Sequence, residues 1–167
     1  MAAQTHTACV ALGANIGEPL RQIAAAFAAL AALPGTRVLA RSSLYRSAPV
    51  GYADQPDFIN AVAMIETALA PHALLDALLA IERAHGRVRE FPNSPRTLDL
   101  DIVLYGDVVL QEPGLTIPHA RMLERAFVML PLAEIAPDAV VPGQGKVSDL
   151  ARLVDAASVA QLQKILV

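Results

Sequence analysis

Residues 95–105 read PRTLDLDIVLY, and this alternation of polar and apolar residues predicts the strand on which the fold is built. In a strand, Asp99 and Asp101 share one face, while the leucine and isoleucine side chains beside them point to the other face. Two positions along a strand separate these carboxylates by roughly 7 Å. They can therefore bind one cation together or one cation each. The alternative interpretation is an ordinary half-exposed strand with no ligand.

The size and composition of the chain predict a globular protein with a single domain over residues 1–167. Of its residues, 54% are hydrophobic and only 17% are charged, which excludes a disordered chain. The net charge is −3, so we expect no nucleic-acid partner and no attraction to an anionic membrane. A polyanionic substrate would then need local arginines or bound metal ions.

Cys9 is the only cysteine, so the chain has no disulfide framework. It lies in an apolar run, where we expect a buried thiol with no catalytic role. The N-terminus resembles no signal peptide, and no apolar run reaches the roughly 20 residues of a membrane span. We therefore expect a cytoplasmic monomer without a membrane partner.

The order of predicted elements through Tyr105 is βαββαβ, the ferredoxin-like arrangement of an α+β fold. Helices begin at Pro19 and Pro71, and Gly35 and Gly86 mark their ends. This order predicts an antiparallel sheet with both helices on one face. The predicted strands lie over residues 8–12, 36–46, 58–67 and 99–105. The predicted buried helix residues are Leu20, Ile23, Phe27, Leu30 and Ala31, followed by Leu74, Leu75, Leu78, Leu79 and Ile81.

Beyond this core we expect a short strand over residues 107–110 that returns beside the strand of Asp99. Residues 119–137 are predicted to be helical, with an interruption near Pro131. The tail after Gly145 is also predicted to be helical and can cover the second face of the sheet. The chain thus adds C-terminal helices to the ferredoxin-like core.

Basic side chains are concentrated on both sides of the two aspartates. Any one of them can be an ordinary solvated charge, but the guanidinium group matches phosphate oxygens, and metal ions held by carboxylates also bridge phosphates. Together these groups are the parts of a phosphoryl-transfer site, although neither a P-loop nor a GxGxxG motif occurs. The cluster consists of Arg87, Arg89, Arg96, His119, Arg121 and Arg125.

Two further positions are candidates for contacts with a ligand. Glu82 is predicted at the end of the second helix, where it can accept a hydrogen bond from a ligand hydroxyl or pair with Arg87. Phe58 and Asn60 share a strand face, so a ring that stacks on a flat heterocycle lies beside an amide that can read its edge. The alternative places Phe58 in the core and leaves Asn60 as a hydrogen-bonding group at a strand end.

Taken together, these segments resemble the 6-hydroxymethyl-7,8-dihydropterin pyrophosphokinase family of the folate pathway. The resemblance covers roughly residues 8–138, and its motifs follow the order found in the family. They are Gly13-x-Asn15, Ser42-Ser43-x-Tyr45, Pro49-x-Gly51, Asp54-Gln-Pro-Asp-Phe-x-Asn60, Glu82-x-x-x-Gly86-Arg87-x-Arg89, Pro95-Arg-Thr-Leu-Asp-Leu-Asp-Ile102, Pro118-His119, Arg125-x-Phe127 and Pro131-Leu-x-Glu-Ile-Ala-Pro137.

The resemblance implies an ATP-dependent enzyme that transfers pyrophosphate to the hydroxymethyl group of a dihydropterin and releases AMP. It implies that Asp99 and Asp101 hold two Mg²⁺ ions and that Arg87 and Arg96 act with them in catalysis. The implied ATP-binding residues are Glu82, Arg87, Arg89, Arg96, Thr116, His119 and Arg125. The implied pterin-binding residues are Ser47, Ala48, Val50, Phe58, Asn60 and Phe127.

Two other classes of function remain open for this fold. A regulatory domain that only binds a small molecule would not need the two aspartates together with the arginine cluster. An RNA-binding sheet is disfavoured by the acidic balance and by the lack of a basic, aromatic strand motif.

Overall fold

The computed structural model describes residues 4–48, 54–86, 98–160 and 162–165. Its first part follows the predicted order with one strand more than predicted: β1 (His6–Ala14), α1 (Pro19–Ala31), β2 (Thr36–Arg41), β3 (Leu44–Ser47), β4 (Phe58–Thr67), α2 (Pro71–Ala84) and β5 (Asp99–Tyr105). The second part contains β6 (Leu110–Glu112), β7 (Leu115–Ile117), a 3₁₀ turn (Met122–Glu124), α3 (Ala126–Ile135), β8 (Val140–Val141), β9 (Gly145–Lys146), α4 (Val147–Ala151), α5 (Ala156–Ala160) and β10 (Leu162–Ile165).

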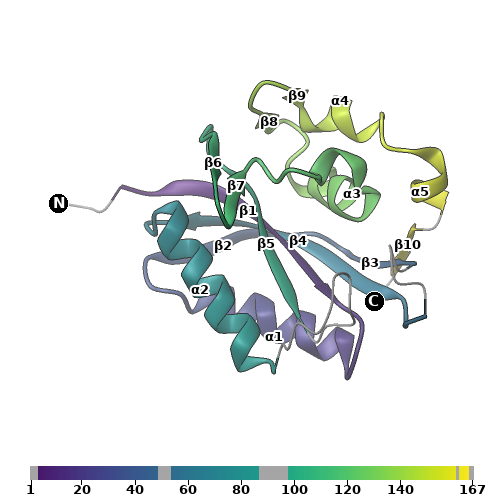
Figure 1. Cartoon of the computed structure of the whole chain (residues 1–167), viewed down its shortest axis with the longest axis horizontal. Helices are drawn as coiled ribbons and strands as arrows, with labels where there is room; N and C mark the ends of the chain where they lie inside the picture. Colours follow the sequence, from purple (N-terminus) through teal and green to yellow (C-terminus); the bar gives the residue numbers. More distant parts are fainter. Residues whose placement is uncertain (1–3, 49–53, 87–97, 161, 166–167) are drawn as a thin grey trace.

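The main sheet is antiparallel throughout, with β1 hydrogen-bonded between β4 and β5. Its strand order is β10-β3-β4-β1-β5, and β2 also pairs with β4. Helices α1 and α2 cover one face of this sheet, whereas α3 and α4 lie on the other face (Figure 1). The predicted α+β fold with an antiparallel sheet and additional C-terminal helices is confirmed.

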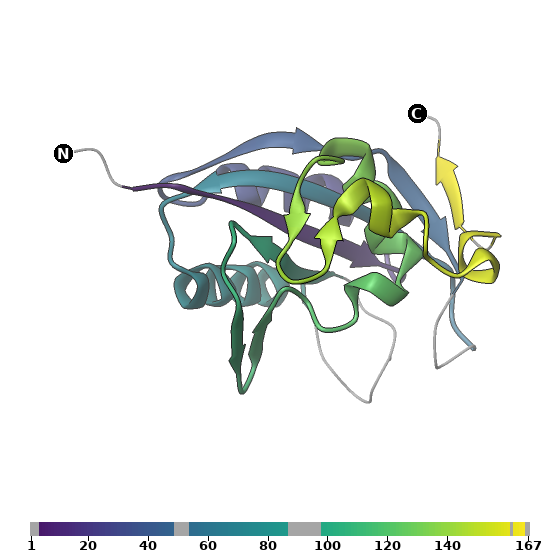
Figure 2. The same cartoon turned by 90° about the horizontal axis from the view of Figure 1, so that it is seen from above.

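Two apolar cores share this sheet because alternate strand residues point to opposite faces. Val10, Ile65 and Leu100 face α1 and α2, and each is almost fully buried. Val62 and Met129 belong to the second core, under α3 and α4. The described C-terminal helices thus cover the second face, as expected, and Figure 2 shows them lying across the strands from above.

Three helix residues predicted to be buried are exposed. Leu20 lies in the first turn of α1 and keeps 53% of its surface exposed, and Ala31 is exposed in the last turn. Leu79 of α2 is 38% exposed because it lies beside the stripe that Leu74 and Leu78 bury against the sheet. Helical periodicity identifies the stripe, but the extent of the sheet beneath the helix decides which end residues are covered.

The predicted strand over residues 36–46 is two strands, β2 and β3, which pair one after the other with β4. The break lies at Ser42, where the backbone N–H still donates to the Val62 carbonyl at 2.9 Å. In return, the Val62 N–H donates to the Ser42 hydroxyl at 2.8 Å, so a side chain replaces a backbone carbonyl in the ladder. This substitution lets the chain bend without leaving a buried amide unpaired.

Three predictions about the C-terminal part are wrong in detail. The strand predicted over residues 107–110 is instead β6, which pairs with β7, because the turn at Gly106 (φ 51°) directs the chain away from β5. Helix α3 continues through Pro131, and the break in residues 119–137 falls at Arg125, whose backbone is extended. The tail ends in a strand, since β10 pairs with β3 at the edge of the main sheet.

A carboxylate at the end of α3 connects this helix to β3. Glu134 accepts hydrogen bonds from the Ser43 hydroxyl at 2.8 Å and the Tyr45 hydroxyl at 2.7 Å, and its two oxygens also face the Ser43 N–H. Burial raises the pKa of Glu134, but the hydrogen bonds from Tyr45 and Ser43 outweigh it and lower the pKa overall. The carboxylate therefore stays ionised and holds α3 over the sheet.

A second buried carboxylate connects α2 to the beginning of β5. Glu82 is only 4% exposed and accepts a hydrogen bond from the Leu100 N–H at 2.7 Å. Leu100 lies between Asp99 and Asp101, so this bond helps to set the position of the acidic pair.

We expect Glu82→Ala to lower the free energy of unfolding by about 1–3 kcal/mol, because it leaves the Leu100 amide buried without this acceptor. Glu82→Gln is the matched control, since its amide oxygen can still accept the bond, and we expect a smaller loss. Chemical denaturation of the three proteins measures the difference. Equal stability of the alanine variant and the wild type would contradict the role assigned to Glu82.

Candidate active site

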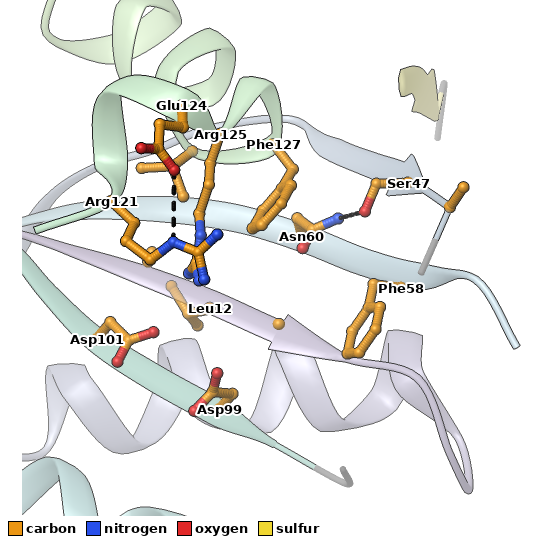
Figure 3. Close-up of a pocket in the computed structure, with 14 residues that line it drawn as sticks. Leu12, Ser47, Phe58, Asn60, Asp99, Asp101, Arg121, Glu124, Arg125 and Phe127 are labelled. Atoms are coloured by element: carbon orange, nitrogen blue, oxygen red, sulfur yellow. Dashed lines mark hydrogen bonds and ion pairs between the residues drawn. The ribbon is translucent and has the colours of Figure 1, made fainter. Parts of the chain in front are cut away.

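A cavity of about 230 Å³ opens on the face of the sheet that carries α3. Its floor is formed by neighbouring strands, and its roof by the 3₁₀ turn and the start of α3 (Figure 3). Acidic, basic, aromatic and amide side chains meet in this one space. The cavity is lined by Ala11, Leu12, Gly13, Ser47, Ala48, Phe58, Asn60, Asp99, Asp101, Arg121, Glu124, Arg125, Phe127 and Val128.

The acidic end of the cavity is formed by β5. Asp99 and Asp101 are both half-buried and both line the cavity, so the predicted shared face is observed. Asp99 lies opposite Gly13 of β1, and Asp101 lies opposite Ala11. Because these neighbours are small, nothing on β1 covers the two carboxylates. Within the described part of the chain, no group of three or more His, Cys, Asp or Glu side chains is gathered for a metal ion.

The basic groups of the cavity come from the segment that follows β7. Arg121 and Arg125 both line it and extend from the roof toward β5 (Figure 3). Arg121 Nε lies 3.4 Å from a carboxylate oxygen of Glu124, and the Arg125 guanidinium lies 5.5 Å from the centre of the Phe127 ring. Positive charge thus faces the aspartates across the cavity, which relieves the repulsion between two neighbouring carboxylates.

His119 is placed beside this charge cluster by a backbone hydrogen bond. Its N–H donates to the carbonyl of Val103, at the irregular position in the pairing of β5 with β1. Burial and then the nearby Arg125 lower the pKa of His119, although Asp99 acts in the opposite direction. The Arg121 N–H donates to His119 Nδ1 at 3.1 Å, so the neutral ring carries its proton on Nε2.

The opposite end of the cavity combines rings with an amide. Phe58 and Asn60 belong to β4, while Phe127 extends from α3 on the other side of the space (Figure 3). Asn60 is buried, and its Nδ2 donates to the Ser47 hydroxyl at 2.7 Å. Its carbonyl oxygen remains on the side of β1 and the cavity. This end suits a flat heterocycle with polar edge groups.

The structure thus brings together most of the described residues that the sequence predicted. Asp99, Asp101 and Arg125 line the cavity, and so do the predicted pterin-binding residues Ser47, Ala48, Phe58, Asn60 and Phe127. Glu82, Thr116 and His119 do not line it: Glu82 is buried under β5, and Thr116 is a half-buried residue of β7. The predicted residues Val50, Arg87, Arg89 and Arg96 lie outside the described residues.

Six cavity residues were not predicted as site residues: Ala11, Leu12, Gly13, Arg121, Glu124 and Val128. Arg121 belongs to the basic cluster seen in the sequence, but neither it nor Glu124 had an assigned role. Ala11 and Gly13 lie on the same face of β1, two positions apart. Their spacing of two residues could have predicted a shared strand face. Only the pairing of β1 with β4 and β5 shows that this face lies between Asn60 and the two aspartates.

The fold thus carries a cavity with a charged end and an aromatic end, an arrangement that suits an enzyme acting on small molecules. The family model described as 7,8-dihydro-6-hydroxymethylpterin-pyrophosphokinase (HPPK) matches residues 9–137. The chain belongs to this family. The family predicted from the sequence motifs is therefore confirmed.

Named relatives agree with this family. The chain is 56% identical over 133 residues to the 2-amino-4-hydroxy-6-hydroxymethyldihydropteridine pyrophosphokinase of Pseudomonas aeruginosa. The matched region covers 80% of this chain and 82% of the relative. It is 49% identical over 146 residues to the enzyme of the same name from Haemophilus influenzae, covering 87% of this chain and 91% of the relative.

A solved structure supports the fold alone. A triple mutant of Plasmodium falciparum HPPK-DHPS, crystallised with pteroate, matches 98% of this chain with a TM-score of 0.74 at 14% identity. The chain spans only 47% of that solved chain.

The lowered pKa of His119 predicts a pH-dependent contribution to stability. A histidine whose pKa is lower in the folded state binds a proton more readily when unfolded, so the free energy of unfolding decreases as the pH falls through about 6.5. We expect His119→Asn to reduce this decrease, because asparagine does not titrate. Denaturation of the wild type and of His119→Asn at pH 7.5 and pH 5.5 measures the decrease in each protein. The other histidines are present in both proteins, so the difference between the two decreases reports on His119. A steeper loss in the variant would contradict the assignment.

Proposed function

We propose that this chain transfers pyrophosphate from ATP to the hydroxymethyl group of 6-hydroxymethyl-7,8-dihydropterin, a step of folate biosynthesis, and that its cavity performs the reaction. Membership of the family supports the reaction. The observation that carries the proposal for the site is one cavity with two aspartates at one end and two phenylalanines with an amide at the other. These ends suit the two substrates, a polyphosphate and a flat heterocycle.

In this proposal, Asp99 and Asp101 bind two Mg²⁺ ions together with the phosphates of ATP. Carboxylate oxygens suit this metal, which often binds through one or two carboxylates, water and substrate phosphates rather than a full set of protein ligands. The two aspartates are half-buried, share a face and are roughly 7 Å apart along β5. Bound Mg²⁺ would neutralise the phosphate charge and orient the chain of phosphates.

The phosphates of ATP are then bound between the aspartates and the basic side chains. Arg125 reaches the cavity from the start of α3, and His119, whose neutral ring is protonated on Nε2, is close enough to Asp99 for the charge of this carboxylate to affect its pKa. The predicted roles of Arg87, Arg89 and Arg96 in ATP binding, and of Arg87 and Arg96 in catalysis, belong to the proposal as well. So do the predicted contacts of Glu82 and Thr116 with ATP.

The dihydropterin occupies the aromatic end of the cavity. Phe58 and Phe127 contact the faces of the ring system, and the carbonyl oxygen of Asn60 accepts a hydrogen bond from its edge. The Ser47 hydroxyl holds the Asn60 amide in this orientation. Ala48 also lines the cavity. The predicted contact of Val50 with the pterin belongs to the proposal as well.

The reaction in this proposal needs no nucleophilic side chain, because the alcohol of the substrate attacks the β-phosphorus directly. The chain contributes orientation and charge neutralisation, which are the main parts of phosphoryl-transfer catalysis. Cys9 takes no part: burial raises the pKa of its thiol to about 12, and it lies in the second core. The thiol is therefore protonated at neutral pH.

The proposal also includes a single domain over residues 1–167, a monomer and a cytoplasmic location. The two apolar cores share one sheet, which supports a single domain. None of the helices in the described ranges has the length and apolar character needed to cross a membrane.

We expect Asp99→Ala and Asp101→Ala each to lower turnover more than tenfold, which corresponds to more than ~1.4 kcal/mol of transition-state stabilisation. Thermal stability should hold or rise, because one of two neighbouring like charges is removed. Asp107→Ala is the matched control, since Asp107 is an exposed aspartate just beyond β5. Steady-state kinetics with Mg²⁺ and thermal melting test this. Retention of more than a tenth of the wild-type rate by either variant would show that the metal role is wrong.

We expect AMP, and not ADP, as the nucleotide product. Attack at the β-phosphorus releases AMP with the pterin diphosphate, whereas attack at the γ-phosphorus would release ADP with a monophosphate. Chromatography of the nucleotides after turnover with Mg²⁺ separates these outcomes. ADP as the main product would refute pyrophosphate transfer even if the pterin proved to be the acceptor. Binding of the pterin without turnover would favour a regulatory domain.

A further inference from the structure

Strand β1 separates the two ends of the cavity. On one side it pairs with β4, which carries Phe58 and Asn60, and on the other side with β5, which carries Asp99 and Asp101. Neighbouring strands lie about 4.8 Å apart, so β4 and β5 are about 10 Å apart across β1. Any group that passes from the aromatic end to the acidic end must therefore cross β1.

The register of the sheet places Gly13 at the centre of this crossing. Gly13 lies opposite Asn60 on β4 and opposite Asp99 on β5. Residues directly opposite each other in an antiparallel sheet point to the same face. The three positions therefore form a row, and its middle position has no side chain.

The backbone does not require glycine at this position. Gly13 does not have the positive φ found at Gly17 or Gly86, so an L-residue can adopt its conformation. A Cβ atom added to Gly13 would lie 3.5 Å from Asn60 Oδ1 and 4.0 Å from the carbonyl oxygen of Ile59. Both distances are ordinary van der Waals contacts. The fold thus accepts alanine at position 13. The role of the glycine therefore concerns the cavity that it lines.

We propose that Gly13 determines acceptor specificity by leaving the floor of the cavity open where the hydroxymethyl arm crosses β1. The inference rests on the proposed function, because it needs the pterin ring over β4 and the phosphates over β5. With the ring edge bound at Asn60, the arm of the acceptor extends along the row toward Asp99. A methyl group on Gly13 would stand in its path and move the attacking oxygen away from the β-phosphorus.

The expected effect is large because the reacting atoms must approach to about 3–3.5 Å, and a displacement of about 1 Å can lower the rate about a hundredfold. Apart from its neighbours in the chain, the added methyl group meets only Asn60 and Ile59 of β4 within 4 Å, and no described atom of β5, where the proposed phosphate site lies. Gly13→Ala should therefore impair the arm-bearing acceptor and the chemical step while leaving ATP binding intact.

The experiment compares the wild type with Gly13→Ala in four measurements. These are kcat, the affinity for a non-hydrolysable ATP analogue with Mg²⁺, the affinities for 7,8-dihydropterin with and without its 6-hydroxymethyl group, and Tm. We expect kcat to fall about a hundredfold and the affinity for the arm-bearing pterin to fall at least tenfold. The affinities for the armless pterin and for the ATP analogue should remain within about twofold of the wild type.

Thr7→Val is the matched control, because Thr7 is an exposed residue on the same face of β1 but outside the cavity. It should match the wild type in all four measurements. If Gly13→Ala keeps more than a third of the wild-type kcat, or weakens both pterins equally, the proposed role in specificity is overturned. A parallel loss of all affinities with a lower Tm also overturns it, since the glycine is then structural. Absence of turnover in the wild type would instead refute the proposed function.

Discussion

The pairing of β1 with β4 on one side and β5 on the other is the constraint on which the rest of the structure depends. It brings Asn60, Gly13 and Asp99 into one row, although these residues are far apart in the sequence. The aromatic end and the acidic end of the cavity are neighbours only because of this pairing. A register shift of one residue on any of the three strands would turn its cavity residues into the opposite core.

The same strands serve the core and the cavity with opposite faces. On β5, Leu100 and Ile102 are buried under α2, whereas Asp99 and Asp101 face the cavity. Half-buried carboxylates close together are unfavourable, and the basic groups across the cavity offset part of this cost. The position of these basic groups depends on α3, which the hydrogen bonds of Glu134 hold to β3.

Much of the fold and of the site follows from local patterns. The alternation in residues 99–105 predicted both the strand and the shared face of the aspartates, because side chains alternate in every strand. Helix starts at Pro19 and Pro71 were correct, since proline suits the first turn of a helix. The position of Phe58 beside Asn60 on one face also follows from alternation. The family motifs then combined these segments into one predicted site.

The sequence by itself therefore determined which segments form strands and helices and which face each side chain occupies, because these properties depend on neighbours along the chain. Only the tertiary structure decided which residues of distant segments lie opposite each other. The break at Ser42, the bond from Leu100 to Glu82 and the place of Gly13 between Asn60 and Asp99 each involve a partner from another segment. Hydrogen-bond partners and register between distant segments are set when the strands pair, and no periodicity within one segment encodes them.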